Sequence, residues 1–311
     1  MAARALSLSL ILLCCSPTFA YPFHYSSWYP WRRSWKRSTG STRNVPSEGF
    51  YNPSLTGGSM LTFVPNTFPE GQGEPLNAIL SGNSDERVLQ DTETNGGLLN
   101  YFASFGFSGE CLGQHSGSDQ GADLGDGNGI LNETAVIRWN YGDPQLGSCK
   151  ETIQGGNHFR YWVQNGPEAN SGAIFMGISY ELPLQLDHDI VSNGYNNGRD
   201  WLVGNITGSA IPSLTLTNGT TYTSTTSFGN YTYQTQITYV DGLLQNTSIG
   251  INHNITVSVE GVVNASDGLV AVLEVSITGT PPTSIAWKPS PSRFWQLYSL
   301  IFVLCLTFLP S

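Results

Sequence analysis

The sequence predicts an α+β fold: a single domain with an antiparallel or mixed β-sheet, few short helices and one disulfide. Runs of β-branched and aromatic residues at 134–141, 158–165 and 172–182 have the composition of strands. Only a few short stretches show the spacing of an amphipathic helix, and two cysteines lie between the apolar chain ends. Because the chain shows no internal repeat and no long linker, we expect one domain over 45–280.

The N-terminal residues have the pattern of a secretory signal. Residues 1–20 carry a positive charge at Arg4, continue with the apolar "LSLSLILLCC" and end at the small residue Ala20. Residues 21–44 form an aromatic, basic lead-in that contains Lys36-Arg37. That pair suits cleavage by a processing protease, and the alternative is a disordered arm that stays attached.

The C-terminal residues 281–311 have the pattern of a glycosylphosphatidylinositol (GPI) signal. The uncharged "FWQLYSLIFVLCLTFLPS" follows a polar spacer, with Ser284 as the candidate attachment residue. We therefore expect a secreted protein that is attached to the plasma membrane by a GPI anchor. The alternative is a single C-terminal membrane segment, although no basic residue follows the apolar tail.

The charge of the expected mature chain, 38–284, is strongly negative. It holds six Lys and Arg residues against 23 Asp and Glu, a net charge of −17. Such a field repels phosphate backbones and predicts no nucleic-acid partner. With so few cations, we expect each arginine to meet a particular carboxylate or anion.

Cys111 and Cys149 are the two cysteines left in the mature chain, and we expect them to form a disulfide. Two thiols without a Cys/His pattern predict no metal site, and we expect no cofactor. Asn-x-Ser/Thr sequons predict N-glycosylation, mostly after residue 200. The acceptors are Asn132, Asn205, Asn218, Asn230, Asn246, Asn254 and Asn264.

The remaining elements follow from local patterns. A short strand is expected within 60–65, a strand at 75–80, a short helix beginning with the Asn83–Glu86 capping box and a helix at 97–105. A Gly/Asp-rich loop at 108–130 precedes the three strands. A short helix at 200–206 follows them, and Asp241-Gly242 and Asp267-Gly268 predict two hairpins.

Familiar catalytic motifs are missing from the sequence. It contains no G-x-S-x-G, H-E-x-x-H, P-loop or G-x-G-x-x-G, and the "DLGDGNG" loop does not fit an EF-hand. Asp119, Asp123 and Asp126 suit either a looser calcium loop or a solvated turn. Three aromatic residues could either stack on a sugar or belong to the core: Trp139, Tyr141 and Trp162. Glycoside hydrolysis needs a pair of carboxylates, and no pair stands out in the sequence.

The candidate site combines His158, Arg160, His188, Arg199 and Asp200. His158 and Arg160 share one strand face, and His188 lies between two aspartates that would raise its pKa. Arg199-Asp200 opens a short helix that could receive an anion. If these groups converge, they bind a phosphate, sulfate or carboxylate, or perform phosphoryl or ester chemistry. The competing interpretation is a structural network in which Arg160 pairs with Asp187, Asp189 or Asp200.

The order of these segments resembles the LssY C-terminal-like domain over 75–205. The matching residues are Pro75, Asn77, Gly82, His158, Arg160, Trp162, Gly177, His188, Arg199 and Asp200. This chain departs from the pattern in the two-residue spacing of His158 and Arg160. Some members are fused to membrane phosphatase-like or transport-like domains, so the resemblance implies a membrane-surface setting and an anion-related role without assigning a reaction.

The sequence thus predicts a secreted, N-glycosylated, GPI-anchored cell-surface protein. It assigns no biochemical activity to this protein, and the expected ligand is an anion. The alternatives are an extracellular hydrolase of phosphate esters or phospholipid headgroups and a carbohydrate-binding cell-wall protein. The expected partners are the cell wall or outer membrane surface and an anionic small molecule or glycan.

Overall fold

The computed structural model describes residues 42–115, 117–259, 261 and 263–282, which belong to one compact unit. The predicted signal peptide, most of the lead-in with Lys36-Arg37, Ser284 and the apolar tail lie outside these residues. Within the described residues, no helix is long and apolar enough to cross a membrane.

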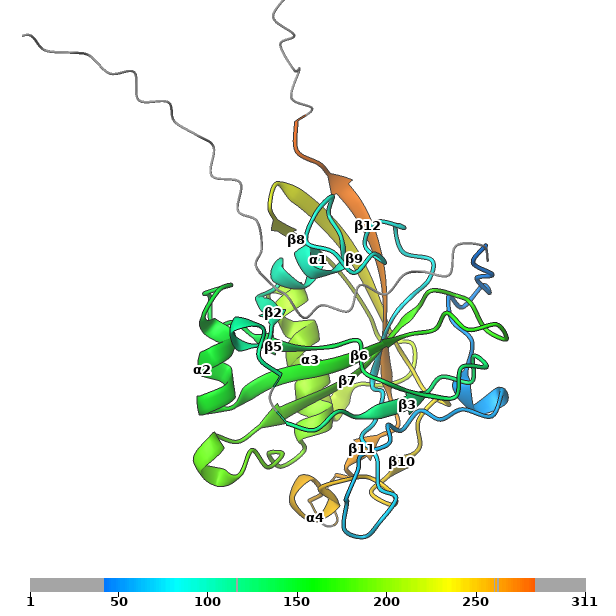
Figure 1. Cartoon of the computed structure of the whole chain (residues 1–311), viewed down its shortest axis with the longest axis vertical. Coiled ribbons are helices and arrows are strands. Elements are labelled where there is room, and N and C mark those ends of the chain that lie inside the picture. Colours follow the sequence, from blue (N-terminus) through cyan, green and yellow to red (C-terminus); the bar gives the residue numbers. More distant parts are fainter. Residues whose placement is uncertain (1–41, 116, 260, 262, 283–311) are drawn as a thin grey trace, which may run out of the picture. The chain divides into compact units, whose positions relative to one another are not determined.

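An eight-stranded mixed sheet organises the chain (Figure 1). Every neighbouring pair is antiparallel except β1 and β12, which are parallel, so the α+β prediction is confirmed. The order across the sheet is β2 (Phe107–Gly109), β5 (Ala135–Trp139), β6 (Gly156–Val163), β7 (Ile174–Glu181), β1 (Ala78–Leu80), β12 (Val270–Gly279), β9 (Tyr231–Val240) and β8 (Thr221–Phe228). Two small ribbons join β3 (Gly121–Asp123) to β4 (Ile130–Asn132) and β10 (Asn246–Thr247) to β11 (Ser266–Asp267).

Helices are short and few in the described part of the chain. They are α1 (Leu98–Ala103), α2 (Gly147–Gln154), α3 (Gly194–Thr207) and α4 (Asn254–Val257), with 3-10 turns η1 (Pro53–Leu55), η2 (Cys111–Gly113), η3 (Leu184–Leu186) and η4 (Ser213–Thr215). The prediction of α1 is confirmed, whereas α3 begins at Gly194 rather than at 200, and α2 was not predicted. The expected helix after Asn83 is wrong, since 86–89 form turns.

The two Asp-Gly hairpins are also wrong. The hairpin joins β8 to β9 instead, through Gly229 and Asn230, whose φ angles of 58° and 64° suit a two-residue turn. Val240, at the end of β9, pairs with Val270 of β12, so 241–269 loop out between paired strands. Gly242 and Gly268 still supply positive φ there, which explains why their sequence resembles a hairpin.

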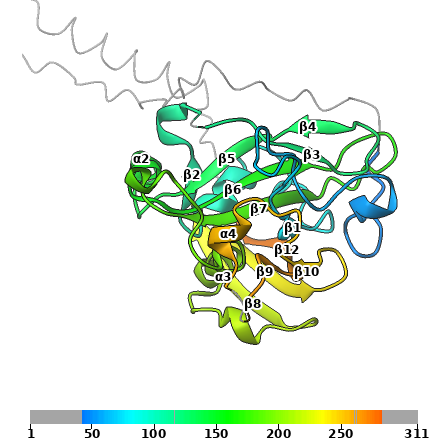
Figure 2. The same ribbon diagram turned by 90° about the horizontal axis from the view of Figure 1, so that it is seen from below.

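The sheet carries a hydrophobic layer on each face. One layer includes Phe159 and Tyr161 with residues of α1 and α3, and the other includes Trp162 and Phe175 with Met60 and residues of β3. Figures 1 and 2 show α3 and the β3–β4 ribbon on opposite sides of β6 and β7. The alternation along β6 therefore decides which layer each of its side chains joins.

Asn77, in the segment before β1, ties the centre of the sheet to α3. Its buried amide donates to the carbonyl oxygens of Ile178 and Tyr195 at 2.9 Å each, and it accepts from the Ile178 N–H at 3.0 Å. A buried polar group that loses its partner is costly, so these three bonds hold β1, β7 and α3 in register.

We expect Asn77→Ala to lower the free energy of unfolding by about 3 kcal/mol, because it leaves buried backbone groups of Ile178 without a partner. Chemical denaturation followed by circular dichroism measures the change. Asn83→Ala is the control, since its side chain makes one exposed bond to the Ser47 carbonyl. Equal effects of the two substitutions would contradict this role for Asn77.

Candidate functional site

Three adjacent strands place charged side chains in one row on the sheet. Arg138 of β5 lies directly opposite His158 of β6, which lies opposite Ser179 of β7. Glu181 follows two residues after Ser179 and therefore points to the same face. Phe159 points the other way, into the layer with α1 and α3. The strand pattern around His158 thus separates a polar face from an apolar one.

Helix α2 covers this row and adds a carboxylate to it. The helix can begin close to β5 because Gly147 has no side chain: a Cβ there would lie 1.4 Å from the Asn140 carbonyl oxygen. Gly156 makes room at the other end, since its Cβ would lie 3.2 Å from Cγ of Glu151. Glu151 is consequently fully buried against the row.

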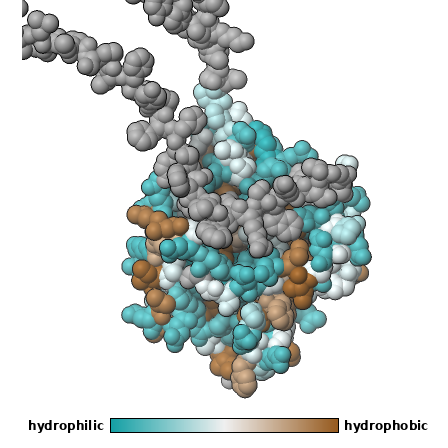
Figure 3. All heavy atoms as spheres, in the orientation of Figure 1, coloured by the Kyte–Doolittle hydropathy of each residue, from teal (hydrophilic) through white to brown (hydrophobic). Residues whose placement is uncertain are grey.

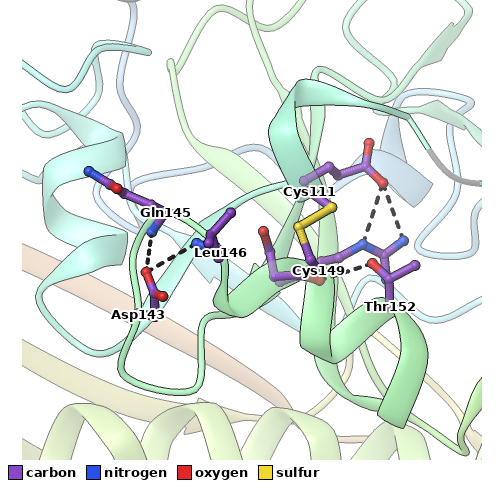
Figure 4. Close-up of a disulfide and its surroundings, with 9 residues drawn as sticks. Cys111, Asp143, Gln145, Leu146, Cys149 and Thr152 are labelled. Carbon is purple, nitrogen blue, oxygen red and sulfur yellow. Dashed lines mark hydrogen bonds and ion pairs between the residues drawn. A yellow bond between two sulfur atoms is a disulfide. The ribbon is translucent and has the colours of Figure 1, made fainter. Parts of the chain in front are cut away.

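The predicted disulfide between Cys111 and Cys149 is confirmed, and it links η2 to α2 (Figure 4). It lies next to Glu110 in the chain and two residues before Glu151. Both carboxylates contact Arg138: its Nη2 lies 3.2 Å from Glu110 Oε1, and its Nη1 lies 2.9 Å from Glu151 Oε2. The disulfide therefore fixes two acidic residues on one buried guanidinium.

We call this group the Arg138 cluster: Glu110, Arg138, Glu151, His158, Glu181 and His188. Glu181 lies at its centre, with Oε2 3.9 Å from Arg138 Nη1 and 3.4 Å from His188 Nδ1. Its Oε1 lies 3.5 Å from His158 Nε2, which also has Ser179 Oγ at 3.3 Å. The cluster gathers three carboxylates, two imidazoles and one guanidinium in a space that is mostly closed to solvent.

Burial shifts the protonation of four of these groups, Glu151, Glu181, His158 and His188, toward their neutral forms. It raises the pKa of Glu151 to about 7, although Arg138 opposes the shift. Burial and the nearby Glu151 raise the pKa of Glu181 to about 8. Burial together with Arg138 lowers the pKa of both His158 and His188. The cluster thus has three carboxyl groups but only one permanently charged base, Arg138. If all three carboxyl groups were ionised, the surplus negative charge would have to be balanced by protons or by a cation.

Three buried atoms of the cluster have no hydrogen-bond partner. They are Oε1 of Glu151, Nδ1 of His158 and Nδ1 of His188. His158 Nδ1 lies 3.9 Å from Glu151 Oε1, too far for a hydrogen bond between them. Buried polar atoms in folded proteins normally have a partner, so these three indicate a position for a further atom.

The predicted convergence of all five candidate residues does not occur. His158, Arg160 and His188 lie on the Arg138 side of the sheet, whereas α3 packs on the opposite face, where Asn157 donates to the Gly198 carbonyl at 2.6 Å. The reason is the period of a strand: Asn157 and His158 point to opposite faces. Arg199 and Asp200 are therefore separated from the other three.

Arg199 is sealed in an ion network of its own. Its side chain is fully buried, with Nε 2.7 Å from Asp200 Oδ1 and Nη2 2.8 Å from Asp267 Oδ2. These carboxylates raise its pKa, and Tyr239 donates a hydrogen bond to Asp200 at 2.8 Å. Arg199 thus has a structural role, and its partners are particular carboxylates, one of the two outcomes expected for each arginine.

Arg160 and His188 also differ from expectation in their partners. Arg160 pairs with Glu133, not with Asp187, Asp189 or Asp200. The expected rise in the pKa of His188 is wrong, because burial and Arg138 lower it. Its neighbour Asp189 contacts His253 at 2.7 Å instead.

The other sequence candidates have structural partners. Asp126 is buried and accepts from the backbone N–H groups of Asn128, Asn165 and Gly166, which favours the turn over the calcium loop. Trp162 is buried and donates to the Leu131 carbonyl at 3.0 Å, so it belongs to the core.

The predicted glycosylation sites differ in exposure. Five acceptors are exposed: Asn132, Asn218, Asn230, Asn246 and Asn264. Asn254 is half-buried, and Asn205 on α3 has its amide nitrogen buried. An N-linked glycan is bonded to that nitrogen, so the native packing of α3 does not favour a glycan on Asn205.

Comparison with known proteins yields no match among protein-family models, curated proteins or solved structures. The resemblance to the LssY C-terminal-like domain therefore stays a prediction. The site is described by its own geometry, in which Arg138, Glu151 and Glu181 are residues that the sequence did not single out.

We expect the metal-free protein to become less stable as the pH rises from about 6.5 to about 8.5. The folded state holds protons on Glu151 and Glu181 that the unfolded chain has released, so stability falls as the pH passes the raised pKa values of about 7 and about 8. The loss is on the order of 2 kcal/mol. Above pH 6.5, the lowered pKa of His158 contributes little.

Thermal unfolding in the presence of EDTA measures this slope. Glu181→Gln should flatten it, because the amide cannot lose a proton. Glu48→Gln is the control, as this exposed residue lies outside the cluster. A melting temperature that stays level or rises over this pH range would contradict the charge assignment.

Proposed function

We propose that this chain is a secreted, N-glycosylated protein of the cell surface that binds a cation at the Arg138 cluster. The signal pattern of 1–20, the GPI pattern of 281–311 and the exposed acceptor asparagines support the location. The disulfide between Cys111 and Cys149 suits an oxidising compartment. Attachment by a GPI anchor at Ser284 is the form that we favour over a single membrane segment.

The charge of the cluster is the observation that favours a cation over the anion expected from the sequence. Three carboxylates face one guanidinium, and both imidazoles are neutral near pH 7. The arginines that could receive an anion already contact acids. Arg43 pairs with Glu86, Arg87 with Asp85, Arg138 with Glu110 and Glu151, Arg160 with Glu133, and Arg199 with Asp200 and Asp267. An anion that bound to any of these five arginines would have to displace a carboxylate.

A hydrolase is the second candidate, because Glu151 and Glu181 would exchange protons close to neutral pH. In this scheme Glu181, the more exposed of the two, donates a proton to a leaving group. Arg199 takes no part, since it lies on the other face of the sheet. Phosphate esters suit this site less well than the sequence suggested, for the same reason of charge.

Exposed apolar side chains lie on the segments that carry or flank the cluster and suit a binding surface. Leu112, Leu146, Ile153, Leu184 and Leu186 are each more than half exposed. They lie on or next to η2, α2 and η3, and Figure 3 shows hydrophobic side chains over α2 and the segment after β7.

We expect divalent cations to raise the melting temperature of the metal-stripped protein near pH 7.5, and phosphate or sulfate to leave it unchanged. Differential scanning fluorimetry of the mature chain measures both. Glu181→Gln should reduce the response to cations, and Glu48→Gln should not. Stabilisation by phosphate alone would contradict the proposal.

We expect a phosphatidylinositol-specific phospholipase C to release the protein from intact cells. Released protein should partition into the aqueous phase of a detergent separation, because the lipid stays behind. Replacement of Ser284 by a bulky residue should abolish the release. Protein that remains in the detergent phase after complete digestion would favour a membrane segment.

A further inference from the structure

One part of the Arg138 cluster has the donors of a metal site. In Glu151, His158 and Glu181, one ligand atom of each lies within 4.8 Å of the other two. The three residues come from α2, β6 and the end of β7, which are held together by the sheet register and the disulfide. A preformed arrangement of this kind lowers the cost of binding an ion.

The hydrogen bond of His158 indicates which ring nitrogen is free. Ser179 Oγ lies 3.3 Å from Nε2, so we assign the ring proton to Nε2, which donates to that hydroxyl and leaves Glu181 available as a ligand. Nδ1 then carries a lone pair, and it faces Glu151 Oε1 at 3.9 Å. Both atoms are buried without a hydrogen-bond partner, and neither can donate to the other when Glu151 is ionised. Two acceptors that face each other in this way require a cation or a proton between them.

The spacing suits a small ion. Ligand atoms about 2.1 Å from a tetrahedral metal lie about 3.4 Å apart. His158 Nδ1 and Glu151 Oε1 are 3.9 Å apart, so a shift of about half an ångström brings them to that separation. Glu181 supplies the third ligand, and His188, whose Nδ1 lies 3.4 Å from Glu181 Oε2, stands beside it as a fourth donor.

Arg138 is compatible with an ion at this position. It binds Oε2 of Glu151 at 2.9 Å and leaves Oε1 free. Carboxylates that ligate a metal are commonly held by such an outer hydrogen bond, which fixes their orientation. Three carboxylates around Arg138 leave enough negative charge for a divalent ion.

We propose that Glu151, His158 and Glu181 bind one divalent transition-metal ion of the Zn²⁺ or Mn²⁺ class, with His188 as an adjacent donor. This inference rests on the proposed cation site and names its ligand. One imidazole nitrogen with carboxylate oxygens favours these ions over Ca²⁺ and Mg²⁺, which prefer oxygen ligands alone. Glu181 is the most exposed of the three ligands, and we expect the ion to enter past it.

The test uses the full mature chain, stripped of metal with a chelator. Isothermal titration with Zn²⁺ and Mn²⁺ gives stoichiometry and affinity, and Co²⁺ absorption reports the coordination geometry. We expect one equivalent of ion, a visible Co²⁺ spectrum and a loss of affinity of about 100-fold or more in His158→Ala. Glu181→Gln should also weaken binding strongly, and His188→Ala by about 10-fold.

A second acidic group provides the matched control. His115, Asp119 and Glu133 also place ligand atoms within 4.8 Å of one another, but His115 and Asp119 are exposed and Glu133 pairs with Arg160. His115 also contacts Glu110 at 2.8 Å, so the control is Asp119→Asn, whose contacts are with His115 and Asn132, and it should leave the binding of Zn²⁺ unchanged. Binding that is lost in Asp119→Asn, or kept in folded His158→Ala and Glu181→Gln, would overturn the assignment of the ligands.

The choice of ion separates this inference from the proposed function. Stoichiometric binding of Ca²⁺ or Mg²⁺ without Zn²⁺ or Mn²⁺ would keep the cation site and overturn its assignment to a transition metal. Failure of every divalent ion to bind at pH 7.5 would overturn both. Circular dichroism of each variant identifies those that fail to fold. If His158→Ala does not fold, the affinity of Glu181→Gln tests the assignment, because Glu181 is the more exposed residue.

Discussion

The contact between Arg138 and the carboxylates of Glu110 and Glu151 is the interaction on which the site depends. Arg138 is almost fully buried in a strand, where an unpaired cation would be strongly destabilising. Its partners come from η2 and α2, two segments that the 38-residue loop between Cys111 and Cys149 would otherwise leave independent. The disulfide and the guanidinium thus stabilise the same junction, one by a covalent bond and one by charge. Loss of either would release α2, and with it Glu151, from the sheet.

The same contact decides what the site can bind. A single guanidinium balances only one of the three carboxylates that surround it, and burial keeps both imidazoles neutral. The other two carboxylates take up either protons or a cation, and neither state leaves a free positive group for the phosphate or sulfate that a cluster of arginines and histidines first suggests. The site is also tightly covered, because α2 begins against Asn140 at Gly147 and Glu151 packs against Gly156. An ion fits this description better than an extended organic molecule does.

The sequence predicts the strands well, because β5, β6 and β7 are rich in β-branched and aromatic residues that alternate between two buried faces. It does not predict α2, whose residues "GSCKETIQ" lack an apolar stripe and which is held by the disulfide and by charge. Glu151 was therefore missed. A signal existed in Arg138, a lone arginine within a strand pattern, which requires an acidic partner. The position of Arg199 could not be predicted, because spacing along the chain does not reveal which face of the sheet a later helix covers.

The charge of the site depends on Glu151 and Glu181 holding protons near neutral pH when no cation is bound. Nuclear magnetic resonance of ¹³C-labelled glutamate side chains in metal-free protein measures this directly. We expect two carboxyl resonances with titration midpoints near 7 and near 8, which Glu151→Gln and Glu181→Gln assign. Midpoints close to 4.5 for every glutamate, the value of an unperturbed carboxyl group, would contradict it.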